Sequence, residues 1–312
     1  MSAMPRGGRN YERGPPLAAR LIVAVFLVSH AALAAAELLV VVPEVREPYR
    51  SVLAQIVDGI RTVASARVTQ STEKTAPNSR LNRSGSAAPV TIVLGSTAVS
   101  AAAQMSDRQS VIVGAVIMPT GEPPLPGISL EPDPGRLFDQ LVRLQPRVRT
   151  VHWLYRPARS GWLLERAQAA ADERKLRLVA VATLDARSAA QRYQEILATA
   201  DSTTDALWLS QDPAILGEDS TLPDILERAW AKNVIVFSGS AQHVARGALF
   251  ALFPDNVGMG ADLAKMALRS GKGGATKFEL NRSLRRAINR RTAEHLRIAM
   301  EPGDYDLVLP VR

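Results

Sequence analysis

A chain of 312 residues with 46% hydrophobic and 22% charged residues can bury a large core, which excludes an intrinsically disordered protein. The absence of cysteine excludes disulfide bonds, thiol catalysis, thiolate metal sites and a lipid-bearing cysteine after a signal peptide. The formal net charge of +8 falls to +5 without the four arginines and one glutamate of the first 36 residues, a modest excess that favours small anions or a membrane surface over nucleic acid as partners.

The first 36 residues have the layout of a secretory signal peptide. Four arginines precede an apolar run from Leu21 to Ala34, and A-x-A cleavage sites lie at 32–34 and 34–36. The run is shorter than the roughly 20 residues of a membrane-spanning helix, although an uncleaved anchor remains the alternative. Export of a chain without cysteine predicts a soluble protein of a bacterial periplasm.

Short apolar strands alternate with amphipathic helices after this leader. Strands are predicted at 37–43, 66–71, 90–95 and 111–117, and helices at 49–64 and 97–105. The polar segment 72–89 stands where a crossover helix is expected between parallel strands. This first lobe is therefore predicted to be reduced.

A second series follows a proline- and glycine-rich linker at 119–127. Helices are predicted at 134–146, 163–176, 189–200 and 221–233, and strands at 150–155, 177–183, 205–210 and 234–239. Such alternation predicts βαβ crossovers and mostly parallel sheets with helices on both faces. The expected fold class is α/β, with two doubly wound lobes and an inter-lobe cleft.

Residues 282–291, RSLRRAINRR, form a basic stretch with apolar residues at helical spacing. We expect a helix with a solvated basic face, and a membrane-surface helix is the alternative.

The sequence lacks the usual signatures of catalysis. His152, His243 and His295 are the histidines beyond the leader, and none has a partner at the spacing of a zinc site. Neither the G-x-S-x-G turn of the α/β hydrolases nor the phosphate-binding loop occurs, and GMGADL at 258–263 has only part of the dinucleotide fingerprint. We expect no metal, no cofactor and no enzymatic activity.

Polar residues follow four of the predicted strands, where open α/β sheets bind ligands. These stretches are Gly95-Ser96-Thr97, Tyr155-Arg156, Ser210-Gln211-Asp212 and Ser238-Gly239-Ser240. Ser96 and Thr97 open a helix, so helix capping explains them as well as anion binding does. Together the four stretches favour a binding cleft over an enzyme site.

The segment VHWLYRPARSGW at 151–162 combines aromatic and basic residues. We expect its first part to lie in the core, namely Val151, Trp153 and Leu154. The residues expected at the cleft are Tyr155, Arg156 and Ser160. Arg159 and Trp162 are assigned to loop and helix packing.

Three motifs between residues 127 and 296 carry a family resemblance. They are Tyr155 with Pro157 after a strand, the polar loop Ser210 to Asp212, and Phe278-Glu279-Leu280 with Asn281. In this order they resemble the periplasmic substrate-binding proteins of ABC transporters, in the group that includes predicted tryptophan and tyrosine binders.

The resemblance implies a type 1 periplasmic binding fold, in which two lobes close on a ligand. The implied first lobe is 37–128 plus about 249–275, the second is 129–248, and a closing segment spans 276–312. The implied partners are a small amino-acid-like solute and an inner-membrane ABC permease, with no nucleic acid, and the protein is expected to be a monomer. The candidate ligand-binding residues are Ser96, Thr97, Tyr155, Arg156, Asp212, Ser240 and Asp255.

Hydroxyl and N–H groups would hold the carboxylate of such a solute, and Asp212 or Asp255 would hold its amine. The first lobe departs from the family pattern through its polar segment and its short linker. A lobe that had lost its ligand contacts would leave a non-transport accessory or sensory protein with a degenerate cleft. An exported enzyme is the third hypothesis.

Overall fold

The computed structural model describes residue 1 and residues 37–71, 90–102, 111–119, 124–217, 221–274, 276–301 and 303–310. The signal peptide expected at 1–36 and the polar segment 72–89 lie outside the described residues, apart from Met1. Residues 36–312 form one compact unit. No helix in the described part of the chain is long and apolar enough to cross a membrane.

The first sheet combines strands from the N-terminal part of the chain with one strand from near its C-terminus. The strand order is β11-β5-β4-β3-β1-β2, and every pairing in it is parallel. Its strands are β1 (Leu38–Pro43), β2 (Ala66–Ser71), β3 (Thr91–Leu94), β4 (Val111–Val116), β5 (Gly127–Pro132) and β11 (Phe278–Asn281). Helices α1 (Tyr49–Arg61), α2 (Ser96–Ala102) and α9 (Asn256–Ser270) accompany it.

The second sheet has the order β13-β12-β10-β9-β8-β6-β7, and its β10–β12 pair is antiparallel. Its strands are β6 (Thr150–Tyr155), β7 (Arg177–Ala182), β8 (Asp205–Leu209), β9 (Ile235–Ser238), β10 (Phe250–Pro254), β12 (Leu284–Asn289) and β13 (Leu307–Leu309). The remaining helices are α3 (Pro134–Leu144), α4 (Pro157–Ser160), α5 (Leu164–Glu173), α6 (Ala186–Thr199), α7 (Thr221–Lys232), α8 (Ala241–Arg246) and α10 (Arg290–His295). Two mostly parallel sheets with interleaved helices confirm the expected α/β class.

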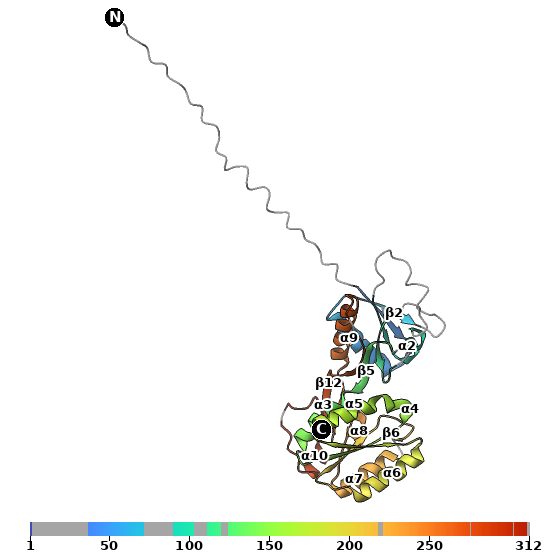
Figure 1. Ribbon diagram of the computed structural model, residues 1–312, viewed down its shortest axis with the longest axis vertical. Helices are drawn as coiled ribbons and strands as arrows, with labels where there is room; N and C mark the ends of the chain where they lie inside the picture. The colour runs from blue at the N-terminus through green and yellow to red at the C-terminus, as the bar shows by residue number, and fades with distance from the viewer. Residues whose placement is uncertain are drawn as a thin grey trace. The chain divides into compact units, whose positions relative to one another are not determined.

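Helices cover both faces of the second sheet, with α3 and α5 on one side and α6 and α7 on the other (Figure 1). Trp153 packs in the core under α3 and α5, whereas the next residue, Leu154, packs in the core under α6 and α7. Trp153 stacks on Trp208 with ring centroids 4.6 Å apart, and Phe138 of α3 meets Trp208 edge-on at 5.6 Å. Both core assignments from the sequence are confirmed, on opposite faces of the sheet.

The chain passes between the two sheets at three neighbouring places in its described part. These are the exits of β5, β10 and β11. Backbone hydrogen bonds join the passages, from Asp133 N to Asn281 O at 3.0 Å and from Asp255 N to Ser283 O at 2.9 Å. Strand β10 therefore pairs in the second sheet, while α9, which follows it, packs against α1 beside the first sheet.

The stretch 282–291 is not the helix that its spacing suggested. Residues Leu284–Asn289 form strand β12, which pairs antiparallel with β10 and buries Ala287 and Ile288. A short apolar run fits both a helix and a strand by its pattern, and here the partner strand β10 decides the outcome. The alternation also does not predict β5, which begins at the end of the proposed linker.

Helices α1 and α9 approach so closely that glycine is needed on both. A Cβ atom at Gly59 would overlap the backbone oxygen of Val257, and one at Gly260 would overlap the backbone oxygen of Ile56. This reciprocal contact holds α9, which follows a strand of the second sheet, against the first.

We predict that Gly260→Ala lowers the free energy of unfolding by about 1–3 kcal/mol, because the added methyl forces the helices apart. The loss occurs although alanine favours a helix by about 1 kcal/mol over glycine. Equilibrium urea unfolding measures the change. Gly161→Ala is the control, because its Cβ would meet no atom closer than 3.9 Å. If the free energy of unfolding of Gly260→Ala matched or exceeded that of the wild type, the close packing of α1 and α9 would be wrong.

Candidate functional site

Polar residues gather where neighbouring parallel strands of the second sheet end. Strands β6, β8 and β9 are adjacent and parallel, so their carboxyl ends lie at one edge of the sheet. Arg156 follows β6, Ser210 to Asp212 follow β8, and Gly239 with Ser240 follow β9. The sheet thus brings together three of the four predicted strand-end stretches.

Arg156 and Asp212 form a bidentate ion pair across this edge. Arg156 Nε donates to Asp212 Oδ2 at 2.7 Å, and Arg156 Nη2 donates to Oδ1 at 3.2 Å. Burial of Asp212 raises its pKa, but the hydrogen bonds from Arg156 and from Ala214 N–H outweigh burial, so the pKa is lowered overall. Asp212 stays ionised, and its two oxygens already have partners within the chain.

Glu131 adds a buried carboxyl group from the first sheet. It lies near the end of β5, and Gln211 Nε2 donates to its Oε2 at 2.9 Å. Burial raises the pKa of Glu131 to about 7, against the opposing effects of the Gln211 hydrogen bond and the charge of Arg159. A Cβ at Gly239 would lie 2.5 Å from Gln211 Nε2 and 3.0 Å from Pro132, so glycine leaves the room for this contact.

Arg159 belongs to the same cluster, although the sequence assigned it to loop and helix packing. Its positive charge lowers the pKa values of both Asp212 and Glu131 among their lesser causes. The side chain is half-buried, and it has no hydrogen bond or ion pair with any described residue. Arg159 is therefore a cation placed beside two acids without a fixed partner. Trp162 packs edge-on against Phe278 at 5.7 Å, which confirms its packing role.

Tyr155 lies mostly in the core. Its side chain is 9% exposed, and it stacks on Trp153 with ring centroids 4.8 Å apart. Ser160 is also buried, and its backbone N–H bonds to Arg156 O. Neither side chain is free to act at the surface of a cleft as the sequence suggested.

The other predicted residues stand apart from the Arg156–Asp212 pair. Ser96 and Thr97 are exposed at the start of α2, and Ser240 caps α8 by accepting from Gln242 N at 3.3 Å. Asp255 precedes α9 with no capping bond from its side chain. In the described part of the chain, Ser96, Thr97 and Asp255 make no hydrogen bond or ion pair with Arg156, Asp212 or Glu131.

Glu131 is the site residue that the sequence reasoning missed. Its only signal is a carboxylate within the short apolar strand GISLEP, and that strand was not predicted because a proline-rich segment precedes it. Gln211 lies inside a predicted stretch but was not singled out.

We predict that the wild type loses stability relative to Glu131→Gln as pH rises from about 5 to 8. The raised pKa means that the folded state keeps a proton which the unfolded chain, at the ordinary value of 4.5, has released. The relative loss is on the order of 3 kcal/mol, at about 1.4 kcal/mol per pKa unit. Urea unfolding at several pH values measures it. Exposed Glu227→Gln should keep the wild-type pH slope, and an unchanged slope in Glu131→Gln would contradict the assignment.

Comparison with known proteins gives a fold but no close relative. No family model matches the sequence, and no curated protein sequence matches it either. Solved structures do match. A ligand-free, open substrate-binding protein with adhesive properties from Clostridium difficile is 12% identical, with a TM-score of 0.62 over 88% of this chain and 99% of that one.

Two further structures match over similar lengths. One is an ABC domain in complex with L-Trp from Streptococcus pneumoniae, 17% identical, with a TM-score of 0.55 over 88% of this chain and 99% of that one. The other is a periplasmic ribose ABC transporter protein from Conexibacter woesei, 15% identical, with a TM-score of 0.52 over 85% and 96%. With its two mostly parallel sheets, this chain has the fold of the type 1 periplasmic binding proteins.

Proposed function

We propose that this protein is the periplasmic solute-binding component of an ABC transport system. It captures a small amino-acid-like solute between its two halves, the first half being the first sheet with its helices and the second half the second sheet with its helices. The observation that carries the proposal is the half-buried guanidinium of Arg159, which has no partner among the described residues, beside the buried carboxyl of Glu131. A cation and an acid so placed complement the carboxylate and the amine of an amino acid.

The two acids of the cluster have different parts in this proposal. Asp212 is held by Arg156 and by Ala214 N–H, so it keeps Arg156 in place instead of binding the amine. Glu131 has a pKa of about 7, and an ammonium group beside it would favour its ionised form. The amine-binding role therefore moves from Asp212 to Glu131, with Asp255 as the second candidate.

The hydroxyl groups of the first half are proposed to complete the site. Ser96 and Thr97 lie at the N-terminus of α2 and are exposed. On closure of the two halves they would meet the solute from the side opposite to Arg159, as strand-end residues do in open α/β sheets. Tyr155 and Ser240 would contribute only the edges of their side chains.

The matched structures support binding over catalysis as the role of this fold. They are an L-Trp complex, a substrate-binding protein and a ribose transporter component. Delivery to an inner-membrane permease and location in the periplasm follow from the same proposal, together with the signal-like leader.

A non-transport accessory or sensory protein is the second candidate function. It is favoured by the Arg156–Asp212 pair, which satisfies within the chain two side chains that a solute would otherwise contact. The experiment below separates the two functions.

We predict that an amino acid raises the melting temperature of the purified protein in a concentration-dependent way. A ligand at about 100 times its Kd adds about 2.7 kcal/mol to the free energy of unfolding, and each kcal/mol is worth about 2–4 °C in a domain of about 150–250 residues. A thermal-shift screen of the common amino acids, with ribose as a sugar comparison, measures the effect.

Two variants test whether the amino acid binds at Arg159. Arg159→Gln should abolish most of the shift because the solute carboxylate loses its cation, whereas Arg187→Gln, exposed on α6, removes the same charge elsewhere and should leave it intact. No shift for any amino acid would contradict solute capture of this class and favour the accessory role. An equal shift in both variants would remove Arg159 from the site.

A further inference from the structure

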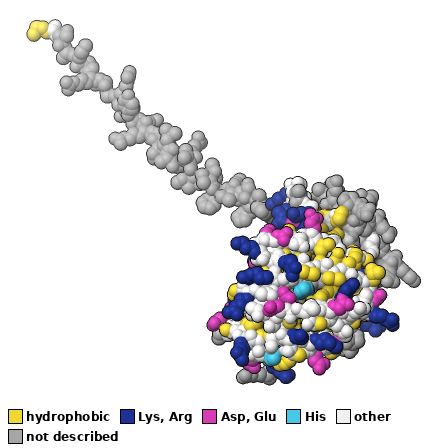
Figure 2. Space-filling model, turned by 60° about the horizontal axis from the view of Figure 1, so that its bottom comes forward, with side chains coloured by type: hydrophobic (Ala, Val, Ile, Leu, Met, Phe, Trp, Pro, Cys, Tyr) yellow, Lys and Arg dark blue, Asp and Glu magenta, His cyan; other side chains and the backbone are white. Residues whose placement is uncertain are grey.

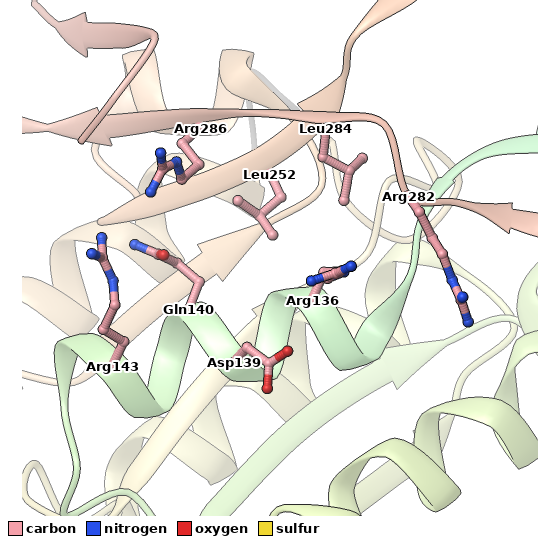
Figure 3. A pocket seen from close by; sticks show the side chains of 8 residues that line it. All are labelled: Arg136, Asp139, Gln140, Arg143, Leu252, Arg282, Leu284 and Arg286. Carbon is pink, nitrogen blue, oxygen red and sulfur yellow. The ribbon is translucent and has the colours of Figure 1, made fainter. Parts of the chain in front are cut away.

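A groove of about 420 Å³ lies beside the second sheet (Figure 3). Its walls come from helix α3, from strands β10 and β12, and from Arg282 in the connection between β11 and β12. It shares no lining residue with the cluster around Arg156 and Glu131. A groove of this size is within the range that small molecules fill.

The pairing of β12 with β10 explains why the groove has an apolar floor. Leu284 and Arg286 are two residues apart, so they project from the same face of β12. Arg286 pairs directly with Leu252 of β10, which brings that leucine beside it. Arg285 projects from the other face, with its guanidinium 5.7 Å from the ring centroid of Phe253.

Helix α3 forms the opposite wall with side chains at helical spacing. Arg136, Gln140 and Arg143 line the groove from positions four and three residues apart, which place them on one side of the helix. Figure 3 shows the side chains of Arg143, Gln140 and Arg286 gathered at one end of the groove and the two leucines along its middle. N–H donors from two elements therefore surround one end, and an apolar surface adjoins it.

The charge of the groove is only partly balanced by the chain. Among the described residues that line it, Asp139 is the one acid, and that carboxylate is held by Arg174 Nε at 2.7 Å. Asp304 pairs with Arg143 at 2.8 Å. The guanidinium groups of Arg136 and Arg286 have no ion pair or hydrogen bond with any described residue.

The arginines are also a local feature. On the face shown in Figure 2, Lys and Arg side chains are dispersed among Asp and Glu and do not form one continuous basic field. A long polyanion such as a nucleic acid needs an extended basic track, whereas two unpaired guanidinium groups beside two leucines suit a compact anion with an apolar part.

We propose that this groove is a second ligand site, which binds a small organic anion through its phosphate or carboxylate group. Arg286 and Gln140 hold the anionic group, Leu252 and Leu284 contact a short hydrocarbon body, and Arg136 adds a further cation along the wall. Arg143 stays paired with Asp304 beside them. The site is independent of solute capture at the strand ends.

The test uses hexyl phosphate as the probe in isothermal titration calorimetry of the full chain at low salt. One molecule should bind per chain. The double variant Arg136→Gln/Arg286→Gln should weaken binding at least tenfold, whereas Arg147→Gln/Arg187→Gln, which removes the same charge from exposed positions, should bind like the wild type. Melting temperatures verify that both variants fold.

Further measurements identify which chemical groups of the ligand are recognised, and where it binds. Hexanol and inorganic phosphate should each bind more weakly than hexyl phosphate, because each lacks half of the recognised molecule. Arg159→Gln should not change hexyl phosphate binding, which separates this site from the strand-end cluster. Co-sedimentation with phosphatidylglycerol vesicles distinguishes a lipid headgroup from a soluble anion as the ligand. If the ligand is a lipid, the protein should sediment with the vesicles and hexyl phosphate should release it.

Two results would overturn the proposal. One is equal affinity for hexyl phosphate in the groove double variant and in the wild type. The other is equal weakening in the groove and control double variants, which would reduce the effect to the net charge of the protein.

Discussion

A part-buried hydrogen bond between Gln211 and the buried carboxyl of Glu131 links the two sheets where the polar residues of the candidate site meet. It depends on strand β5, which pairs in the first sheet and then leads into α3 beside the second. It also depends on Gly239, whose lack of a Cβ leaves room for the amide. Because burial raises the pKa of Glu131 to about 7, the charge at this junction changes near neutral pH, whereas the Arg156–Asp212 pair beside it stays ionised.

The two proposed sites share one electrostatic feature, although they lie at different places. In each, some arginines are neutralised by acids of the chain and others are not. Asp212 neutralises Arg156 and leaves Arg159 for a ligand, while Asp304 pairs with Arg143 and leaves Arg136 and Arg286 in the groove. A guanidinium held by a carboxylate loses much of its attraction for another anion. In both proposals the anion binds at a cation that has no ion pair with any described residue.

Much of the fold follows from local pattern. The apolar strand runs are short and the amphipathic helical runs are longer, so strands and helices were predicted where β1, α1, β6 and α6 lie. Strands β5 and β12 were not predicted, because their sequence patterns did not indicate a strand unambiguously. A proline-rich segment precedes β5, and β12 has two adjacent arginines in a run too short to tell a helix from a strand. Strand β5 pairs with the distant strand β11 as well as with β4, and β12 pairs with β10, and this pairing decides their structure.

The sequence by itself determined the α/β class, the strand ends as the place for polar residues and the burial of Trp153 and Leu154, because these depend on periodicity and on composition. It did not determine which charges find partners. Only the tertiary structure decided that Asp212 holds Arg156, that Tyr155 packs into the core, and that Glu131 and Arg159 join the site. The Arg156–Asp212 and Gln211–Glu131 contacts join residues far apart in the chain, and no local pattern records such distances.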